Sequence, residues 1–498
     1  CGMGGMGIAQ IYDSNSQKLL AINFAGTAGS KCTEDMWAND PVTRSEVSNL
    51  FQFKDFRSEI GYRAIMTPTV LSAFDEIHKR YCSMPWNELV QPSIDIAKKG
   101  LTVSPNLDQY FQTGYAGGDK NNNPFQPNTY QRFTASEGSK SKYTKTDGSV
   151  YKLGELINMS DYADTLSSIA KNGAREFYEG DLSKIIIQDI EKNGGFVTEQ
   201  DLKNYKPDFV EPLKINYLDY VISSPPPPNT GMSVLQMFKL IEPFQSELKE
   251  HGSFDYLRIL ANAMSIAHQD RLDFNADSKF VNIPVYEKIL NKDYINSKIE
   301  NIKNNVIPNS GNTDKGSTTH VNVVDKQGNW VGITHTLGWA SGVITPGLGF
   351  MYNNGMNLAD PRPGNLNSIA PGKARGSNMV PTVVLKNNKP VIICGAPGGA
   401  VIVSAVFQSI LNSINYNMTP TESVSAPRIH TESGKVFLES RIRSDYKEKL
   451  IDLGFDVVQE QYPYNPMMAR AQLVAIEEKT GELTGGSDPR GGGVVHKV

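Results

Sequence analysis

The chain has 498 residues, of which 39% are hydrophobic and 20% charged, so it can bury a large core and is neither disordered nor a coiled coil. Its formal net charge of −4 gives no long-range attraction for nucleic acid, and we expect no nucleic-acid partner. The four cysteines include no CxxC pair and the seven histidines no HExxH motif, which argues against a disulfide framework or a zinc site. The starting hypothesis is an enzyme that needs neither a metal nor another cofactor.

The chain begins with a glycine-rich segment, Cys1–Gly7, that leads directly into a predicted strand, Ile8–Tyr12. The segment has no basic flank and no apolar stretch, so it does not have the pattern of a signal peptide. A glycine turn that feeds straight into a strand is an unusual start for a fold. We therefore expect the beginning of the fold to be missing from this sequence.

Several segments of the first part of the chain have the 3.6-residue apolar periodicity of helices. The predicted helices are Pro68–Tyr81, Trp86–Lys99, Asp161–Asn172, Leu182–Asn193, Met232–Leu248 and Phe254–Asp270. Glycines follow several of these segments at positions where helices commonly end. Between them, Gly114–Lys152 is rich in Asn, Lys and Gly and predicts a long surface loop.

The sequence changes character near residue 300. A polar segment, Asn301–Gly316, precedes an alternating segment, Thr318–Asp325, and a tight turn then leads to a second one, Trp330–Leu337. These two segments predict a β-hairpin, and a flexible segment beside a buried hairpin is a natural place for a chain cut. Further strands are predicted at Met379–Lys386, Pro390–Gly395, Val436–Leu438 and Ala471–Glu477. A helix-rich first part and a strand-led second part indicate a layered α+β protein.

The uncharged segment Val391–Leu411 has the length of a membrane span. However, Pro397 lies among glycines in its middle and would leave backbone groups unpaired in lipid. A buried strand, a glycine turn and a buried helix describe the segment better. We expect no membrane span in this sequence.

Thr318 is the first candidate for chemistry, because it begins a strand directly after the polar segment. A hydroxyl is a weak nucleophile without an adjacent base, and a threonine at a new N-terminus carries that base as its own α-amino group. The pKa of an α-amino group, about 7.7–8.0, suits a general base near neutral pH. From spacing alone, however, Thr318 and its neighbours are better explained as ordinary β-branched residues of a half-buried strand.

Gly398 and Gly399 are the second candidate. Two glycines between a strand and a helix can direct backbone N–H groups at one point, as an oxyanion hole requires. The helix N-terminus behind them would add a favourable potential for an anion. The alternative is an ordinary tight turn, since glycine pairs are common.

Taken together, these segments resemble the γ-glutamyltranspeptidase family of N-terminal-nucleophile hydrolases over nearly the whole chain. The motifs that carry the resemblance include Thr318-Thr319-His320, Thr334-His335-Thr336-Leu337, Asn353-Asn354-Gly355-Met356, Asp360-Pro361-Arg362-Pro363-Gly364, Gly395-Ala396-Pro397-Gly398-Gly399, Ala426-Pro427-Arg428-Ile429-His430 and Ser487-Asp488-Pro489-Arg490.

The resemblance implies a four-layer αββα sandwich that is made as an inactive precursor. The precursor would cut itself between Ser317 and Thr318, which gives a large fragment 1–317 and a small fragment 318–498 that remain intertwined as one domain. Thr318 would be the nucleophile, Thr336 would hold it by a hydrogen bond, and Gly398 with Gly399 would form the oxyanion hole.

The resemblance also implies partners and a location. The substrate would be a small-molecule or peptide amide, and water or an amine would accept the acyl group. Members of the family are often periplasmic or extracellular, but the segment that would decide the compartment is not in this sequence.

The residues that bind the glutamyl group depart from the family pattern. The expected arginine is absent from Asn23-Phe24-Ala25, and Gly338 stands in place of an asparagine. The expected acidic residue is also absent, since Asn357 and Leu358 follow the Asn353–Met356 motif.

Other residues near these motifs are candidates for rebuilding the acyl site. Ser377 is retained from the family's pair of carboxylate-binding serines, and Asn378 replaces the second. Arg375 and Arg362 are candidate replacements for the lost cation, each with a solvated surface position as the alternative. Trp339 is a candidate apolar wall, unless it is plain core. We therefore take Ser377, Asn378, Gly338 and Arg375 as the candidate substrate-binding residues.

Three functions remain open from the sequence. The enzyme cleaves γ-glutamyl amides such as glutathione, or it is an acylase on another dicarboxylic acyl amide, as in cephalosporin-acylase-like relatives. The third is a scaffold that binds a ligand without turnover.

Overall fold

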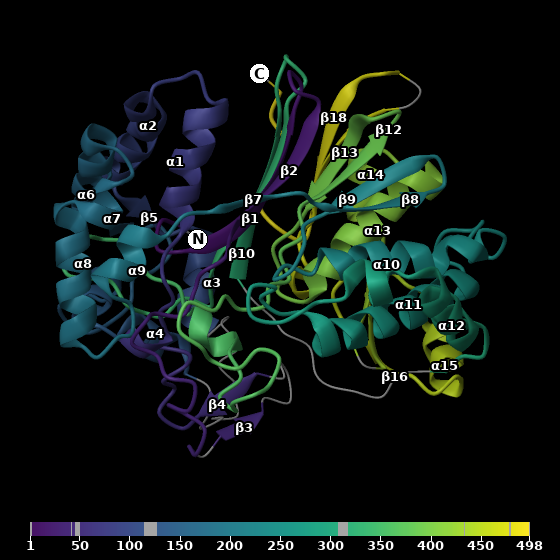
Figure 1. Cartoon of the computed structure of the whole chain (residues 1–498), viewed down its shortest axis with the longest axis horizontal. Coiled ribbons are helices and arrows are strands. Elements are labelled where there is room, and N and C mark those ends of the chain that lie inside the picture. Colours follow the sequence, from purple (N-terminus) through teal and green to yellow (C-terminus); the bar gives the residue numbers. More distant parts are fainter. Residues whose placement is uncertain are drawn as a thin grey trace.

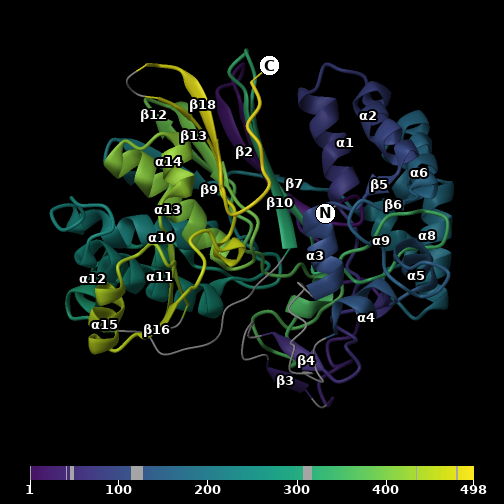
Figure 2. The same cartoon turned by 180° about the vertical axis from the view of Figure 1, so that it is seen from behind.

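Two antiparallel sheets lie face to face in the centre of the molecule, and helices cover the outer face of each (Figures 1 and 2). The computed structural model describes residues 2–40, 42–44, 50–113, 127–306, 317–432, 434–477 and 480–497. The layer order is helix, sheet, sheet, helix, which confirms the predicted α+β class and the αββα sandwich.

The first sheet has five strands in the order β10-β11-β1-β2-β7. Their bounds are β1 Met6–Asp13, β2 Lys18–Phe24, β7 Asp208–Val210, β10 Ser317–Val324 and β11 Trp330–Gly338. Along β11 buried and half-buried residues alternate strictly, as expected for a strand with one face on the core. β1 lies between β2 and β11, and it is buried on both faces along almost its whole length.

The second sheet has six strands in the order β18-β17-β13-β12-β9-β8. Their bounds are β8 Leu213–Tyr217, β9 Tyr220–Ser224, β12 Thr382–Lys386, β13 Lys389–Gly395, β17 Gln472–Ile476 and β18 Leu483–Ser487. Three smaller sheets pair β3 Val42–Arg44 with β4 Phe51–Phe53, β5 Leu101–Thr102 with β6 Leu156–Ile157, and β14 Ile429–Glu432 with β15 Lys435–Leu438 and β16 Asp456–Gln459.

The space between the two large sheets is filled by apolar side chains from both. Tyr12 and Trp330 of the first sheet pack in one buried cluster with Val383 and Ile393 of the second. Gln10 adds a polar tie, since its buried Nε2 donates 3.1 Å to the carbonyl of Ser223 in β9. The sheets are therefore held together by packing and by a hydrogen bond that satisfies the buried side-chain amide of Gln10.

One helical layer covers the first sheet. Its helices are α1 Val70–Tyr81, α2 Trp86–Lys99, α6 Ser160–Asn172, α7 Glu176–Glu179, α8 Asp181–Lys192 and α9 Glu199–Asn204 (Figure 1). The sequence predicted the four longer ones within two residues at each end. α1 packs its apolar face on β1 and β2 through Val70, Ala73 and Ile77.

The other helical layer covers the second sheet. Its helices are α10 Gly231–Ile241, α11 Phe254–Phe274, α12 Lys292–Lys303, α13 Val401–Tyr416 and α14 Pro420–Ser425, with α15 Ser444–Asp452 beside the three-stranded sheet. α10 and α13 are buried almost all round, which explains their near-continuous apolar sequences. The segment Val391–Leu411 is thus the strand β13, a glycine turn and most of α13, as predicted. Among the described residues, no helix has the length and apolar character needed to cross a bilayer.

Several predicted segments were wrong in extent. The predicted helix Phe254–Asp270 continues to Phe274 as α11. The predicted helix Met232–Leu248 ends at Ile241, and a 3-10 turn, Glu242–Phe244, follows it. The polar segment predicted to begin at residue 301 begins inside α12, and its residues 307–316 lie outside the described residues.

The predicted surface loop Gly114–Lys152 was also wrong in part, because it contains helices. It contains α4 Thr129–Phe133 and α5 Glu137–Tyr143, and it follows α3 Pro105–Thr113; residues 114–126 lie outside the described ones. Phe133 packs edge-on against Phe111 with 4.8 Å between ring centroids, so this segment has a small core of its own.

The close approach of the two sheets at Gly395 gives a prediction about stability. A Cβ at this position would overlap the buried imidazole of His320 on β10. We expect Gly395→Ala to lower the free energy of unfolding by about 1–3 kcal/mol, the usual cost of overpacking. Urea denaturation measures this. The control is Gly492→Ala, which should stay near wild type because a Cβ there would lie 3.7 Å from Asn106 Nδ2, an ordinary contact.

Candidate active site

The four predicted substrate-binding residues and the predicted catalytic residues other than Gly398 line one pocket. Its described lining comprises Thr318, Thr336, Gly338, Trp339, Asn357, Leu358, Arg375, Ser377, Asn378, Met379, Gly399 and Ile402. All four candidate substrate-binding residues are in this set, and so are both threonines. The fold thus brings together residues that are spread over 85 positions of the sequence, from 318 to 402.

The two threonines are neighbours on paired strands. Thr318 of β10 lies opposite Thr336 of β11, and its Oγ1 donates to Thr336 Oγ1 over 3.3 Å. Thr336 Oγ1 also accepts from the N–H of Gly338 at 2.8 Å, which fixes its hydroxyl. The β10–β11 ladder shifts register between Ser317 and Thr318, at the bond predicted to be cut. An interrupted ladder leaves local backbone groups without regular partners.

The glycine turn lies across the pocket from the threonines. Gly398 and Gly399 have positive φ angles of 150° and 71°, and α13 begins two residues later at Val401. The turn therefore needs glycine, and it places the N-terminus of a 16-residue helix at the pocket, where Gly399 and Ile402 contribute to the lining. The N-terminal end of such a helix favours a negative charge.

A second loop holds this turn from behind. A Cβ at Gly398 would lie 2.8 Å from Ala469 Cβ, and the N–H of Arg470 donates to the Pro397 carbonyl at 3.2 Å. The turn is thus packed against residues 468–471, so the position of one depends on the other.

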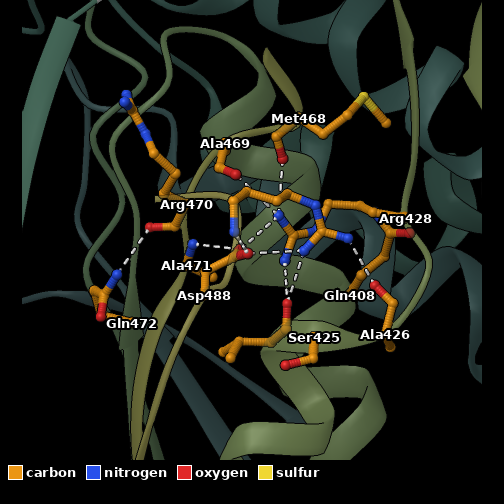
Figure 3. A network of polar contacts seen from close by, with 12 residues as sticks. Gln408, Ser425, Ala426, Arg428, Met468, Ala469, Arg470, Ala471, Gln472 and Asp488 are labelled. Atoms are coloured by element: carbon orange, nitrogen blue, oxygen red, sulfur yellow. Dashed lines mark hydrogen bonds and ion pairs between the residues drawn. The ribbon is translucent and has the colours of Figure 1, made fainter. Parts of the chain in front are cut away.

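The 468–471 loop is anchored by a buried ion pair (Figure 3). Arg428 donates to the carbonyl of Met468 at 2.8 Å and pairs with Asp488 at 3.0 Å. Asp488 in turn accepts from the N–H of Ala471 at 2.9 Å. These charges come from two sequence motifs that the resemblance included without assigning them a role.

Two more charges close this network. Arg490 pairs with Asp488 at 2.9 Å and with Glu439 at 2.5 Å, and both carboxylates and Arg490 have fully buried side chains. Such a network is worth little as a net gain, but removing one member leaves an uncompensated buried charge. It therefore fixes the loop behind the glycine turn.

The candidate substrate-binding segment is held by the proline-rich turn. The N–H of Ser377 donates to the Pro228 carbonyl at 2.8 Å, and the N–H of Thr230 donates to the Ser377 carbonyl at 2.9 Å. Ser377 Oγ accepts from the N–H of Met379 at 3.2 Å, which leaves its own O–H as a donor. The run of prolines is a structural support for this wall of the pocket.

Gly338 lines the pocket by its backbone, for a steric reason. Its φ is 69°, and a Cβ there would overlap Asn354 Oδ1. That oxygen accepts from the N–H of Trp339 at 2.9 Å. This turn therefore has no room for the asparagine that the family pattern places at position 338. The hydrogen bond from Trp339 to Asn354 holds Trp339 in the pocket lining.

Arg375 is the one charged side chain of the described lining, and its residue is 7% exposed. The other candidate, Arg362, is not part of this lining; it is half exposed and pairs with Asp360 at 2.7 Å. Asn357 also lines the pocket, and its buried Oδ1 has no hydrogen-bond partner among the described residues. Sequence reasoning passed over Asn357 as a site residue, although its place directly after the Asn353–Met356 motif was the available signal.

The histidines beside the threonines are not strong bases near neutral pH. Burial lowers the pKa of His320 to about 4 and that of His335 to about 4. His320 Nδ1 lies 2.8 Å from Thr334 Oγ1 and its Nε2 lies 2.8 Å from Asn322 Oδ1, so both of its ring nitrogens have polar partners.

One group of the described residues has the geometry of a metal site. His268, His430 and Glu432 are buried, and their ligating atoms lie within 4.8 Å of one another. However, Arg271 already pairs with Glu432 at 2.5 Å, so a metal cation there would lie beside a guanidinium. These residues are outside the described pocket lining.

A sequence model of one protein family, Gamma-glutamyltranspeptidase, matches residues 1–498. The chain belongs to the γ-glutamyltranspeptidase family. The Glutathione hydrolase proenzyme of Escherichia coli (strain K12) is 30% identical to it over 520 residues, which cover 98% of this chain and 83% of that protein. The Acylase ACY 1 proenzyme of Pseudomonas sp. (strain SE83) is 31% identical over 492 residues, which cover 97% and 83%.

Solved structures of the family support the same fold. The cephalosporin acylase from Bacillus halodurans superposes with a TM-score of 0.84 at 24% identity, covering 98% of this chain and 86% of that one. The γ-glutamyltranspeptidase of Helicobacter pylori gives a TM-score of 0.52 at 27% identity, covering 60% and 79%. The family resemblance is thus confirmed, and its members include both glutathione hydrolases and acylases at similar identity to this chain.

The buried ion-pair network gives a second prediction. In Asp488→Asn, the two arginines lose a carboxylate that no solvent can replace. We expect the free energy of unfolding, measured by urea denaturation, to fall by about 3–5 kcal/mol. Asp445→Asn is the matched control, because its pair with Arg443 is exposed, and this variant should keep the wild-type free energy of unfolding. A wild-type stability for Asp488→Asn would show that the network does not hold the fold.

Proposed function

We propose that this member of the γ-glutamyltranspeptidase family is a self-processing amidohydrolase or acyltransferase with Thr318 as its nucleophile. In the precursor, Thr318 Oγ attacks the carbonyl carbon of Ser317, and the peptide bond to the Thr318 nitrogen breaks. The acyl group of residue 317 thereby moves from nitrogen to oxygen. The hydroxyl proton passes to the Thr318 nitrogen, which becomes a free α-amino group. Water then hydrolyses the ester, which gives residue 317 a carboxyl end and restores the Thr318 hydroxyl. The observation that carries the proposal is the Thr318–Thr336 pair at the interrupted ladder, inside the pocket.

The fragments 1–317 and 318–498 remain together after this cut. Both large sheets contain strands from either side of the bond, because β11 pairs with β1 and β12 pairs with β9. Separating the fragments would expose the apolar faces of both sheets to water.

Turnover repeats the same chemistry on a substrate amide. The α-amino group of Thr318 takes the hydroxyl proton while Oγ attacks the acyl carbonyl. The N–H groups of the Gly398–Gly399 turn and the N-terminus of α13 stabilise the oxyanion. The amine leaves with the proton, and water or another amine then takes the acyl group from Thr318.

The acyl group that best fits the pocket ends in a carboxylate and has no α-ammonium group, as in a glutaryl amide. Arg375 supplies a buried positive charge, and Ser377 and Asn378 add neutral donors. The described lining contains no carboxylate that would balance an ammonium group. Burying the substrate's ammonium group without a carboxylate partner would be costly, so this pocket favours an anionic acyl group over a zwitterionic one.

The walls between this end and the threonines suit a short methylene chain. Trp339, Leu358 and Ile402 line the pocket and bring apolar surface to it. An acyl chain of a few methylene groups would bury its apolar surface there.

A γ-glutamyl amide is the second candidate. The unpartnered Oδ1 of Asn357 is a neutral acceptor in the pocket, and it would accept a hydrogen bond from an α-ammonium group. A neutral acceptor offsets less of the ammonium charge than a carboxylate does. The same substrate panel tests both candidates, since γ-glutamyl-p-nitroanilide and glutaryl-p-nitroanilide differ only in that group.

The self-processing step gives a third prediction. On a denaturing gel the purified protein should separate into fragments of 317 and 181 residues, and the first residue of the smaller one should be Thr318. Thr318→Ala should remain one band and show no acyl transfer, because it lacks the hydroxyl needed for both steps. Thr319→Ala, one residue along the same strand, is the matched control and should mature normally. Maturation of Thr318→Ala would refute the assigned nucleophile, and an uncut, inactive wild type would favour a binding protein.

The buried cation gives a fourth prediction. Arg375→Met should lower kcat/KM for glutaryl-p-nitroanilide by about 10- to 100-fold, the range expected for a lost hydrogen bond to a charged group. For the uncharged butyryl-p-nitroanilide it should change kcat/KM less than about threefold. Arg375→Lys, which keeps the charge, should retain part of the preference. Equal losses on both anilides would mean that Arg375 only supports the fold.

A further inference from the structure

The side-chain amide of Asn378 has one fixed orientation in the pocket. The residue lines the pocket and is 8% exposed. Its Oδ1 accepts from Arg271 Nη1 at 2.7 Å, so the oxygen is turned away to the guanidinium. Among the residues that the structure describes, its Nδ2 has no hydrogen-bond partner, and this group is the one left for a ligand.

Arg271 is itself held by a buried carboxylate. It lies on α11, and its Nη2 donates to Glu432 Oε1 on β14 at 2.5 Å. The side chain of Glu432 is 2% exposed and that of Arg271 is 12% exposed. A charge-assisted bond in such a place is short and well ordered, which restricts the guanidinium to one orientation.

Neither His268 nor Asp270 competes with the Arg271–Glu432 ion pair. His268 Nδ1 lies 3.5 Å from Glu432 Oε1, but burial lowers the pKa of His268 well below its usual value, so the ring is neutral. Asp270, the neighbour of Arg271, accepts instead from Gln236 at 2.5 Å and from Tyr294 at 2.8 Å. Glu432 is therefore the charged partner that anchors Arg271.

We propose that Arg271, anchored by Glu432, is a positioning residue that fixes the sense of the Asn378 amide and thereby makes this wall of the acyl pocket a donor-only surface. A free amide would offer a ligand either its oxygen or its nitrogen. With the oxygen occupied, Asn378 offers only N–H groups. The guanidinium of Arg375 likewise has N–H donors and no acceptor, and Ser377 contributes its O–H as a donor. The matching acyl end accepts hydrogen bonds and donates none, which describes a carboxylate.

This inference rests on the proposed function and adds a test of selectivity. Glutaryl-p-nitroanilide is compared with 4-carbamoylbutyryl-p-nitroanilide, which has the same length but ends in an amide that also donates. In Arg271→Met we expect KM for the glutaryl substrate to rise about tenfold with kcat within about twofold, and the preference for the carboxylate to fall about tenfold. Asn378→Asp, which places an acceptor in the pocket, should reduce the preference further.

A double variant separates positioning from general support. If Arg271 acts through Asn378, then Arg271→Met should add less than about twofold to the KM effect of Asn378→Ala. The matched control is Arg258→Met on the same helix. Within the part of the chain that the structure describes, Arg258 bonds to the Ile302 carbonyl, Asn305 and Asp255 and not to the pocket lining. It should leave the preference unchanged. Additive effects of the two variants, or equal losses on both substrates, would overturn the proposal.

Direct binding distinguishes failure of this inference from failure of the proposed function. Titration calorimetry with glutarate and with glutaramate measures the preference without turnover. We expect the wild type to bind glutarate at least tenfold more tightly and Arg271→Met to lose most of that difference. A wild type that cleaves no anilide refutes the proposed function, while the titration still decides the role of Arg271. Equal ratios in the wild type and Arg271→Met would refute that role even in an active enzyme.

Discussion

The pairing of β11 with β1 is the constraint on which the site depends. β1 is buried on both faces in the middle of the molecule, and β11 is joined to it by a seven-residue register from Met6–Thr336 to Tyr12–Trp330. The hairpin then places β10 at the edge of the sheet, with Thr318 beside Thr336. The hydroxyl of Thr318, the proposed nucleophile, is thus held through β11 by the deeply buried strand β1, while its own strand has one edge without a partner strand in the described sheet.

The opposite side of the pocket is fixed by different physics. The glycine turn is not part of a strand ladder. Its position is set by close packing against Ala469 and by the buried charges that anchor the 468–471 loop. Aligned dipoles at the start of α13 need such a rigid support, because an oxyanion is stabilised only where the donors are already oriented. The first sheet therefore positions the threonine side of the pocket, and the second sheet with its buried charges positions the glycine turn.

Local patterns in the sequence were enough for the layered α+β class and for most helices, while the αββα order followed from the family resemblance. α2 was predicted to the residue, because Pro85 precedes it and Gly100 follows it with a positive φ of 83°. The early end of α10 was not foreseen, because the apolar pattern continues into the 3-10 turn that contains Pro243. The helices within 129–143 were not foreseen, because short polar helices have weak periodicity. The resemblance located the pocket residues. It did not reveal that Asn354 excludes a side chain at Gly338, nor that Arg271 reaches Asn378 across 107 positions, because such contacts arise only after folding.

The exchange of strands between the two parts of the chain would have a consequence for refolding if the chain is cut, as proposed, between residues 317 and 318. Before the cut, folding is a search by one molecule, and its rate does not depend on concentration. Once residues 317 and 318 are separate ends, the same sheets must be assembled from two polypeptides, so refolding becomes a second-order encounter. A native state that formed easily as a precursor would then be kept by the slowness of its unfolding, and dilution after denaturation would not restore it.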